Sequence, residues 1–251
     1  YYLQCPSVVR VNLVGKKAKW ASAKDVILYI LQQLSVKGGV NKIIEYTGEG
    51  LKELSLTDRA TICNMGAELG ATTSVFPTDE ITKEYLIQQG REEDYVELKA
   101  DVDATYDEEI TVDLSKLVPL TAKPHSPDAV VPVSELRGMK INQVVIGSCT
   151  NSSLPDMLKA AKILKGRRVA THVSLVIAPG SSSILAMLSK CGALADMVAA
   201  GARILECGCG PCIGMGQAPL SKGVSLRTIN RNFKGRSGTN DASVYLVSPE
   251  V

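Results

Sequence analysis

Three of the chain's seven cysteines lie within six residues, in a segment of small, turn-forming residues. Glycine and proline separate Cys207, Cys209 and Cys212, and Gly208 and Gly210 let the backbone come close to a bulky inorganic centre. The two-residue gap between Cys209 and Cys212 puts two thiolates on one side of a turn, as in many zinc and iron–sulfur sites. We predict that this segment binds a metal or cluster; a structural thiol pair or a redox-active pair is the alternative.

Cys149 is a candidate for a third ligand from another part of the chain. It follows residues 143–146, an apolar run that predicts a strand, and lies in a polar loop that is a poor setting for a packed core thiol. The cysteine-rich turn follows a similar short strand at residues 203–205. In a mostly parallel sheet, ligands bind outside the carboxyl ends of the strands, so we expect the two loops to meet at one edge.

The number of thiolates separates two kinds of site. Cys149, Cys209 and Cys212 on a cubane cluster would leave one iron without a protein ligand, and an open iron is a Lewis acid that can polarise a hydroxyl or carboxylate group. With Cys207 as a fourth ligand, the same residues would instead form a closed structural zinc site.

Polar and charged residues elsewhere in the chain are also candidates for catalysis or substrate binding. Asn64 and Glu68 are four residues apart in a helix-like segment of small and apolar residues, which predicts that they share one face. A buried carboxylate needs a partner or a metal, so Glu68 is a candidate functional residue; an exposed glutamate on the outer face is the alternative. Arg231 and Arg236 follow a strand-like segment, and arginines so placed could bind carboxylates through paired hydrogen bonds. Ordinary surface arginines are the alternative.

The elements that must position these residues predict an α/β fold with two domains of three-layer αβα type and mostly parallel sheets. Ser22, with Asp25 three residues later, predicts a helix N-cap. Residues 117–133 contain four prolines and few helix formers, which is typical of a linker. We therefore expect one domain over residues 1–117 and a second, which binds the cluster, over 118–251.

Composition excludes several classes of protein. A net charge of +2 among 251 residues, with only short basic patches, gives no nucleic-acid surface. No apolar run reaches the length of a membrane span, and no signal peptide opens the chain. An odd number of scattered cysteines argues against a secreted disulfide framework and for a reducing compartment. We expect a cytoplasmic protein, or one of the mitochondrial matrix if the source is eukaryotic.

Four blocks of the sequence, in this order along the chain, together resemble the aconitase family: residues 62–77, 145–153, 209–214 and 230–236. The resemblance covers nearly the whole chain. It implies that Cys149, Cys209 and Cys212 ligate a 4Fe-4S cluster, which the isolated chain need not retain. Cys207 departs from the pattern, because the family usually has a small residue other than cysteine there.

The resemblance also implies roles for polar residues. Asn64 and Asn230 match asparagines near the cluster and its bound hydroxyl group. Glu68 matches the acidic residue beside the open iron that handles the departing water. Arg231 and Arg236 match arginines that bind substrate carboxylates.

By this resemblance we expect a fragment of aconitate hydratase, a hydro-lyase of the tricarboxylic acid cycle that converts citrate to isocitrate through cis-aconitate. The related isopropylmalate and homoaconitate dehydratases are the alternative, and a non-enzymatic, zinc-stabilised interaction module is a second. His125 and His172 match no family catalytic residue, and the family's serine base lies in a further domain. We therefore expect an inactive fragment. The complete enzyme would act on a tricarboxylate substrate and would include the missing N- and C-terminal domains.

Overall fold

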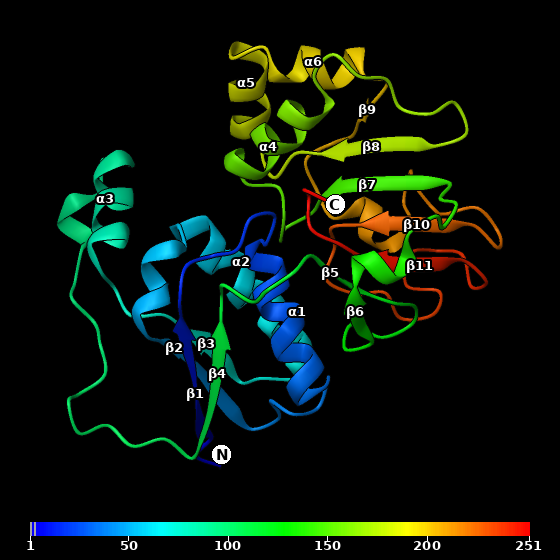
Figure 1. Ribbon diagram of the computed structural model, residues 1–251. Coiled ribbons are helices and arrows are strands. Elements are labelled where there is room, and N and C mark those ends of the chain that lie inside the picture. The colour runs from blue at the N-terminus through cyan, green and yellow to red at the C-terminus, as the bar shows by residue number, and fades with distance from the viewer. Residues whose placement is uncertain (1, 3) are drawn as a thin grey trace. The chain divides into compact units, whose positions relative to one another are not determined.

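A computed structural model of the protein describes residue 2 and residues 4–251. The chain divides into two compact units, Tyr1–Val118 and Pro119–Val251, each with its own sheet (Figure 1). Both units are mixed α/β structures with mainly parallel strands. The fold class predicted from the sequence is therefore confirmed.

The first unit contains a four-stranded parallel sheet in the order β3-β2-β1-β4. Its elements in chain order are β1 (Ser7–Val14), α1 (Ala23–Leu34), β2 (Lys42–Thr47), the 3-10 helix η1 (Glu49–Glu53), α2 (Leu56–Gly66), the 3-10 helix η2 (Ala67–Leu69), β3 (Thr73–Val75), α3 (Glu80–Gln88), the 3-10 helix η3 (Glu92–Asp94) and β4 (Glu108–Asp113).

Buried side chains of β1 and of the capped helix α1 contribute to the core of the first unit. Val9, Val11 and Leu13 of β1 are fully buried, while the residues between them are half-buried, as expected for a strand that turns one face to the core. The N-cap predicted at Ser22 is confirmed. Its side chain accepts a hydrogen bond from the Asp25 amide, and the Asp25 carboxylate accepts one from the Ser22 amide at 2.6 Å.

The second unit contains a seven-stranded sheet in the order β6-β5-β11-β10-β7-β8-β9. Its elements in chain order are β5 (Leu120–Ala122), β6 (Val130–Pro132), the 3-10 helix η4 (Val133–Leu136), β7 (Gln143–Gly147), α4 (Leu154–Leu164), β8 (Ser174–Ala178), α5 (Ser182–Lys190), α6 (Ala193–Ala199), β9 (Arg203–Ile204), the 3-10 helix η5 (Gly210–Ile213), β10 (Val224–Arg227) and β11 (Ser243–Leu246).

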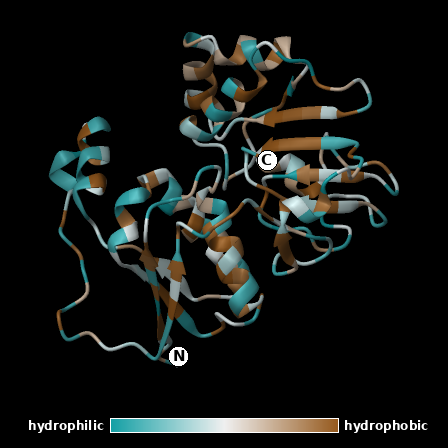
Figure 2. Cartoon of the chain, viewed as in Figure 1, coloured by the Kyte–Doolittle hydropathy of each residue, from teal (hydrophilic) through white to brown (hydrophobic). Residues whose placement is uncertain are grey.

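Helices α4, α5 and α6 cover one face of the second sheet. Apolar side chains of β7 and β8 pack there against buried residues of the three helices, and Figure 2 shows both strands as hydrophobic over much of their length. The opposite face carries Gln143 and Arg227, which hydrogen-bond to backbone carbonyls of Pro211, Gln217 and Ala218. The segment after β9 therefore lies over this face and brings the cysteine-rich turn with it.

The proline-rich segment at residues 117–133 is not a free linker, so that prediction was wrong over most of its length. β5 pairs antiparallel with both β6 and β11, which adds a short hairpin to the edge of the second sheet. The prolines are compatible with this position because edge strands tolerate a missing amide donor.

No single helix among the described residues has both the length and the apolar composition needed to cross a membrane. The pair α5 and α6, bent by 86°, meets that test only when the two are taken together.

Candidate metal centre

The loop after β7 presents Cys149 above a tightly packed backbone. Gly147 ends the strand with φ 141°, and a Cβ at this position would lie 2.1 Å from the Ala178 carbonyl oxygen of β8. Only glycine fits so close an approach. Ser148, Thr150 and the residues that follow are buried, whereas Cys149 is exposed, so the loop holds this side chain outward.

The second cysteine loop is a short 3-10 turn. Cys209 is the N-cap of η5, and the Cys212 amide donates to the Cys209 carbonyl at 3.1 Å. The Met215 amide closes the turn by donating to the Gly210 carbonyl at 2.9 Å. Cys209 is exposed, and Cys207 and Cys212 are half-buried. A hollow of about 340 Å³ lies against this turn, lined in part by Gly210 and Met215.

The two loops meet at the carboxyl ends of the parallel strands, as the sequence predicts. Burial raises the pKa of the Cys212 thiol, and the neighbouring sulfurs of Cys149 and Cys209 raise it further. Ser148, one residue before Cys149, hydrogen-bonds to the Cys212 side chain and opposes that shift. Three thiols from two loops therefore lie close enough to interact electrostatically.

This donor set fits an iron–sulfur cluster. Cluster irons bind cysteine sulfur, and three cysteine side chains from two loops lie near one another here, with Cys149 and Cys209 exposed. Within residue 2 and residues 4–251, no three His, Cys, Asp or Glu side chains are already arranged to hold a metal ion. Cys149, Cys209 and Cys212 are the residues that would hold the cluster.

Arg227, which the sequence patterns did not single out, lies beneath the cysteine turn. It is fully buried at the end of β10, and its guanidinium donates to the carbonyls of Pro211 and Gln217 and to the Gln143 side chain. Burial lowers the pKa of Arg227 to about 10, and the nearby Cys212 acts in the opposite direction. The available signal was an arginine in an otherwise strand-like segment, but the sequence does not show what such a side chain faces.

The loop after β10 brings Asn230 to the first cysteine loop. The Thr150 hydroxyl, one residue after Cys149, donates to the Asn230 side-chain oxygen. Thr228 strengthens this junction, because its hydroxyl donates to the Gly147 carbonyl at 2.9 Å and accepts from the Gly147 amide at 2.8 Å. Asn230 is thus placed beside the loop that carries Cys149.

The two candidate arginines follow Asn230 in a tight turn. Arg231 is exposed and Arg236 is half-buried, and the Arg236 amide donates to the Phe233 carbonyl at 2.9 Å. Gly235 between them has φ 73°, which bends the chain as the sequence suggests. The turn leaves both guanidinium groups accessible in part, as binding of a carboxylate requires.

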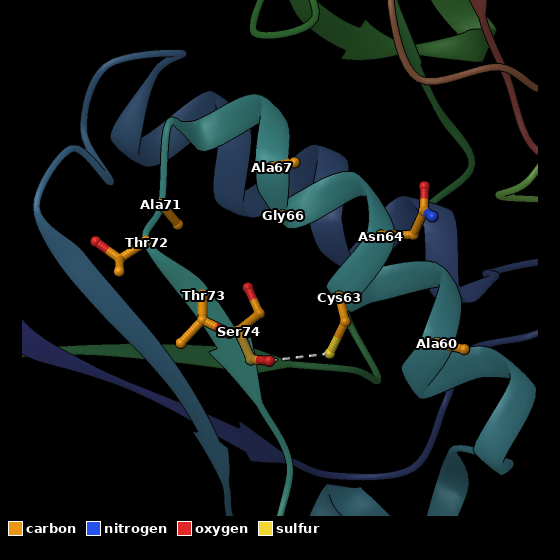
Figure 3. Close-up of a pocket in the computed structure, with 9 residues that line it drawn as sticks. All are labelled: Ala60, Cys63, Asn64, Gly66, Ala67, Ala71, Thr72, Thr73 and Ser74. Carbon is orange, nitrogen blue, oxygen red and sulfur yellow. Dashed lines mark hydrogen bonds between the residues drawn. The ribbon is translucent and has the colours of Figure 1, made fainter.

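Asn64 and Glu68, in the first unit, differ from the prediction that they share a helix face. α2 ends at Gly66, and Glu68 lies in the 3-10 helix η2, where the turn is tighter and the four-residue spacing no longer aligns side chains. Asn64 is exposed and lines a pocket of about 500 Å³ (Figure 3), whereas Glu68 is only 6% exposed. The predicted burial of the carboxylate is therefore observed.

The same pocket contains a thiol that no pattern singled out. Cys63 is a residue of α2, and its side chain points toward β3, where its sulfur donates to the Ser74 carbonyl at 3.5 Å (Figure 3). Burial raises the pKa of Cys63 to about 11. This cysteine is therefore a protonated, unreactive side chain at neutral pH.

Comparison with known proteins gives a consistent family. Residues 1–137 and 134–251 match the family model described as the aconitase family (aconitate hydratase). The chain is 43% identical over 249 residues to 3-isopropylmalate dehydratase large subunit 2 of Archaeoglobus fulgidus and 42% identical over 251 residues to the corresponding large subunit of Clostridium kluyveri. These alignments cover 99% and 100% of this chain, and 60% of each relative.

Two further matches extend this set. The methanogen homoaconitase large subunit of Methanocaldococcus jannaschii is 40% identical over 259 residues, covering 100% of this chain and 61% of the relative. A solved structure of Thermococcus kodakaraensis aconitase X in its holo-form has a TM-score of 0.48 and 17% identity, over 91% of this chain and 50% of that one. The chain spans about 60% of the length of the two dehydratase subunits and the homoaconitase subunit.

Proposed function

Because this chain belongs to the aconitase family, we propose that it forms the cluster-binding part of a hydro-lyase large subunit that dehydrates an isopropylmalate-type or homoaconitate-type hydroxy acid. The supporting observation is the meeting of Cys149 with Cys209 and Cys212 at one sheet edge. Specific assignment to aconitate hydratase, expected from the sequence, is less well supported, because the relatives at 40–43% identity carry dehydratase and homoaconitase names. A place in the tricarboxylic acid cycle loses its support for the same reason.

A bound 4Fe-4S cluster would supply an open iron that polarises the substrate's hydroxyl group. Arg231 and Arg236 would bind substrate carboxylates through charge-assisted hydrogen bonds. Asn230, held by Thr150, would orient the hydroxyl group beside the thiols. Glu68, a buried carboxylate of the first unit, and Asn64 would keep the catalytic roles that the family resemblance implies.

The proposal includes partners. The names of the relatives describe large subunits, which supports a separate small subunit as the partner of this protein. The two compact units would be the second and third domains of a longer enzyme, and the rest would lie on this chain or on that partner. We further propose a cytoplasmic location, consistent with a thiol-bound cluster in a reducing compartment.

Anaerobic reconstitution with iron and sulfide tests the metal centre. We expect a brown protein with stoichiometric iron and sulfide, and loss of both in Cys149→Ser, Cys209→Ser and Cys212→Ser. The matched control is Cys207→Ser, which should load normally. A colourless protein with one zinc ion, lost in Cys207→Ser, would support the zinc-stabilised module and contradict a cluster enzyme.

The loaded protein then tests the substrate class. Adding 3-isopropylmalate or a homoaconitate-type acid should change the electron paramagnetic resonance spectrum of the reduced cluster, because the hydroxy acid would bind the open iron. Citrate should change it less at equal concentration. A larger response to citrate would return the assignment to aconitate hydratase, and no response to any acid would contradict an open iron.

A further inference from the structure

Arg227 is a fully buried cation whose partners are all neutral. Its Nε donates to the Ser225 hydroxyl at 3.0 Å, and its Nη2 donates to the Gln143 side-chain oxygen at 2.8 Å and the Gln217 carbonyl at 2.5 Å. Its Nη1 donates to the Pro211 carbonyl at 2.5 Å. The Ser225 hydroxyl also donates to Gln143 at 2.6 Å, so the whole group forms one connected network.

Neutral acceptors satisfy the donors of this guanidinium but leave its charge uncompensated. None of the ion pairs found among the described residues involves Arg227. A buried charge is costly unless an opposite charge lies nearby. An anionic group close to that loop would therefore stabilise this arginine.

The cysteine turn supplies the position for that anion. Pro211, whose carbonyl binds Arg227, directly precedes Cys212, and Gln217 lies just after the turn. Among the residues that the structure describes, Cys212 is also the ionisable group that attracts the guanidinium charge. Thiolates that bind a metal centre carry negative charge, which matches the unpaired positive charge below them.

We propose that Arg227 is the counter-ion and positioning residue of the thiolate site: its charge offsets that of the ligating thiolates, and its planar fork fixes the Cys209–Cys212 turn from below. This inference rests on the proposed cluster function. Arg227, which is not a cluster ligand, would then have two separable effects. It would slow loss of the cluster, and it would raise the reduction potential of the cluster. Both follow from the known influence of hydrogen bonding and nearby charge on metal–thiolate centres.

Three variants of the full 251-residue chain separate these effects. Arg227→Met removes both charge and donors, and Arg227→Lys keeps the charge but loses the two-pronged fork. Arg168→Met, at an exposed arginine of the same unit, is the matched control. Each reconstituted protein is measured by the rate of iron loss to a chelator and by redox titration of its spectrum.

We expect Arg227→Met to lose iron about 10- to 100-fold faster than the parent chain, the range for residues that support metal ligands. Its reduction potential should become more negative, because a nearby positive charge stabilises the reduced cluster. Arg227→Lys should lose iron faster than the parent yet keep a potential near the parent value. Arg168→Met should match the parent in both. Equal potentials in the parent and Arg227→Met would overturn the counter-ion role.

A measurement without any cluster tests the positioning role independently. In the apo-protein, hydrogen exchange at the Cys212 and Met215 amides reports the turn, since both donate within it. We expect faster exchange there in Arg227→Met and Arg227→Lys, with exchange in β8 unchanged. Unaltered exchange in the turn would overturn the positioning role. If the parent chain takes up no cluster while the turn still loosens, the proposed function fails and the structural part of this inference stands.

Discussion

Replacement of Gly147 by alanine should separate β7 from β8 at the site itself. The new Cβ would lie 2.1 Å from the Ala178 carbonyl oxygen and 2.8 Å from the Ala178 Cβ. Because the first contact is with backbone, relief requires the strand ends to move apart. Overpacking of this kind costs about 1–3 kcal/mol, and the positive φ of 141° adds about 1–3 kcal/mol for a residue with a side chain. The second unit should therefore lose about 2–6 kcal/mol of its free energy of unfolding.

Gly166→Ala is the matched control, because Gly166 also has a positive φ, 71°, but nothing lies within 4 Å of its added Cβ. Strain alone should cost this variant about 1–2 kcal/mol. Native-state hydrogen exchange of β8 amides in urea measures the unfolding free energy of the second unit. Fluorescence of Trp20 follows the first unit and should not change in either variant. Equal losses in the two variants would refute the close approach of β7 and β8.

Two further predictions concern the first unit. Asp79 pairs with the buried Arg59 at 2.5 Å; burial alone would raise the pKa of Asp79, but hydrogen bonds from Arg59 and Thr82 outweigh it, so its pKa lies below the ordinary value for an aspartate. A lowered pKa contributes stability above the unfolded value and loses it as pH falls through the folded value. Urea unfolding by Trp20 fluorescence should thus show a lower stability at pH 7 and a shallower acid loss in Asp79→Asn; parallel pH curves would contradict the pair. For Cys63, with a pKa of about 11, the thiolate fraction at pH 8 is about 10⁻³. Mass spectrometry should therefore find the exposed Cys191 alkylated by iodoacetamide well before Cys63, and equal rates would show that Cys63 is accessible.

Sequence patterns predicted the parts of the fold that depend on short-range signals. The alternation in β1 and the Ser22–Asp25 capping box each involve neighbouring residues, and both appear in the structure. The hairpin of β5 and β6 was missed because its strands have three residues each and depend on a partner, β11, more than 100 residues later. Prolines dominate the local signal there, while long-range pairing determines the structure.

The predictions for the candidate site also agreed with the structure only in part. Parallel strand ends were enough to predict that Cys149 would approach Cys209 and Cys212, because topology alone brings those loops to one edge. The shared face of Asn64 and Glu68 failed because helical periodicity predicts faces only while α-helix geometry continues. The roles of these residues in catalysis remain predictions. Substrate class was assigned too narrowly, since block resemblance identifies a family more readily than a member.

The position of β8 between β7 and β9 has a consequence for how such a protein is made. One thiol comes from residue 149 and the other two from residues 209 and 212, with two strands, β8 and β9, and three helices between them in the chain. A nascent polypeptide leaving the ribosome would present the first sulfur about 60 residues before the others, too early to hold iron with them. Because β8 separates β7 from β9 in the sheet, the three sulfurs can meet only after β8 has taken its place, and loading of iron would follow folding of these strands.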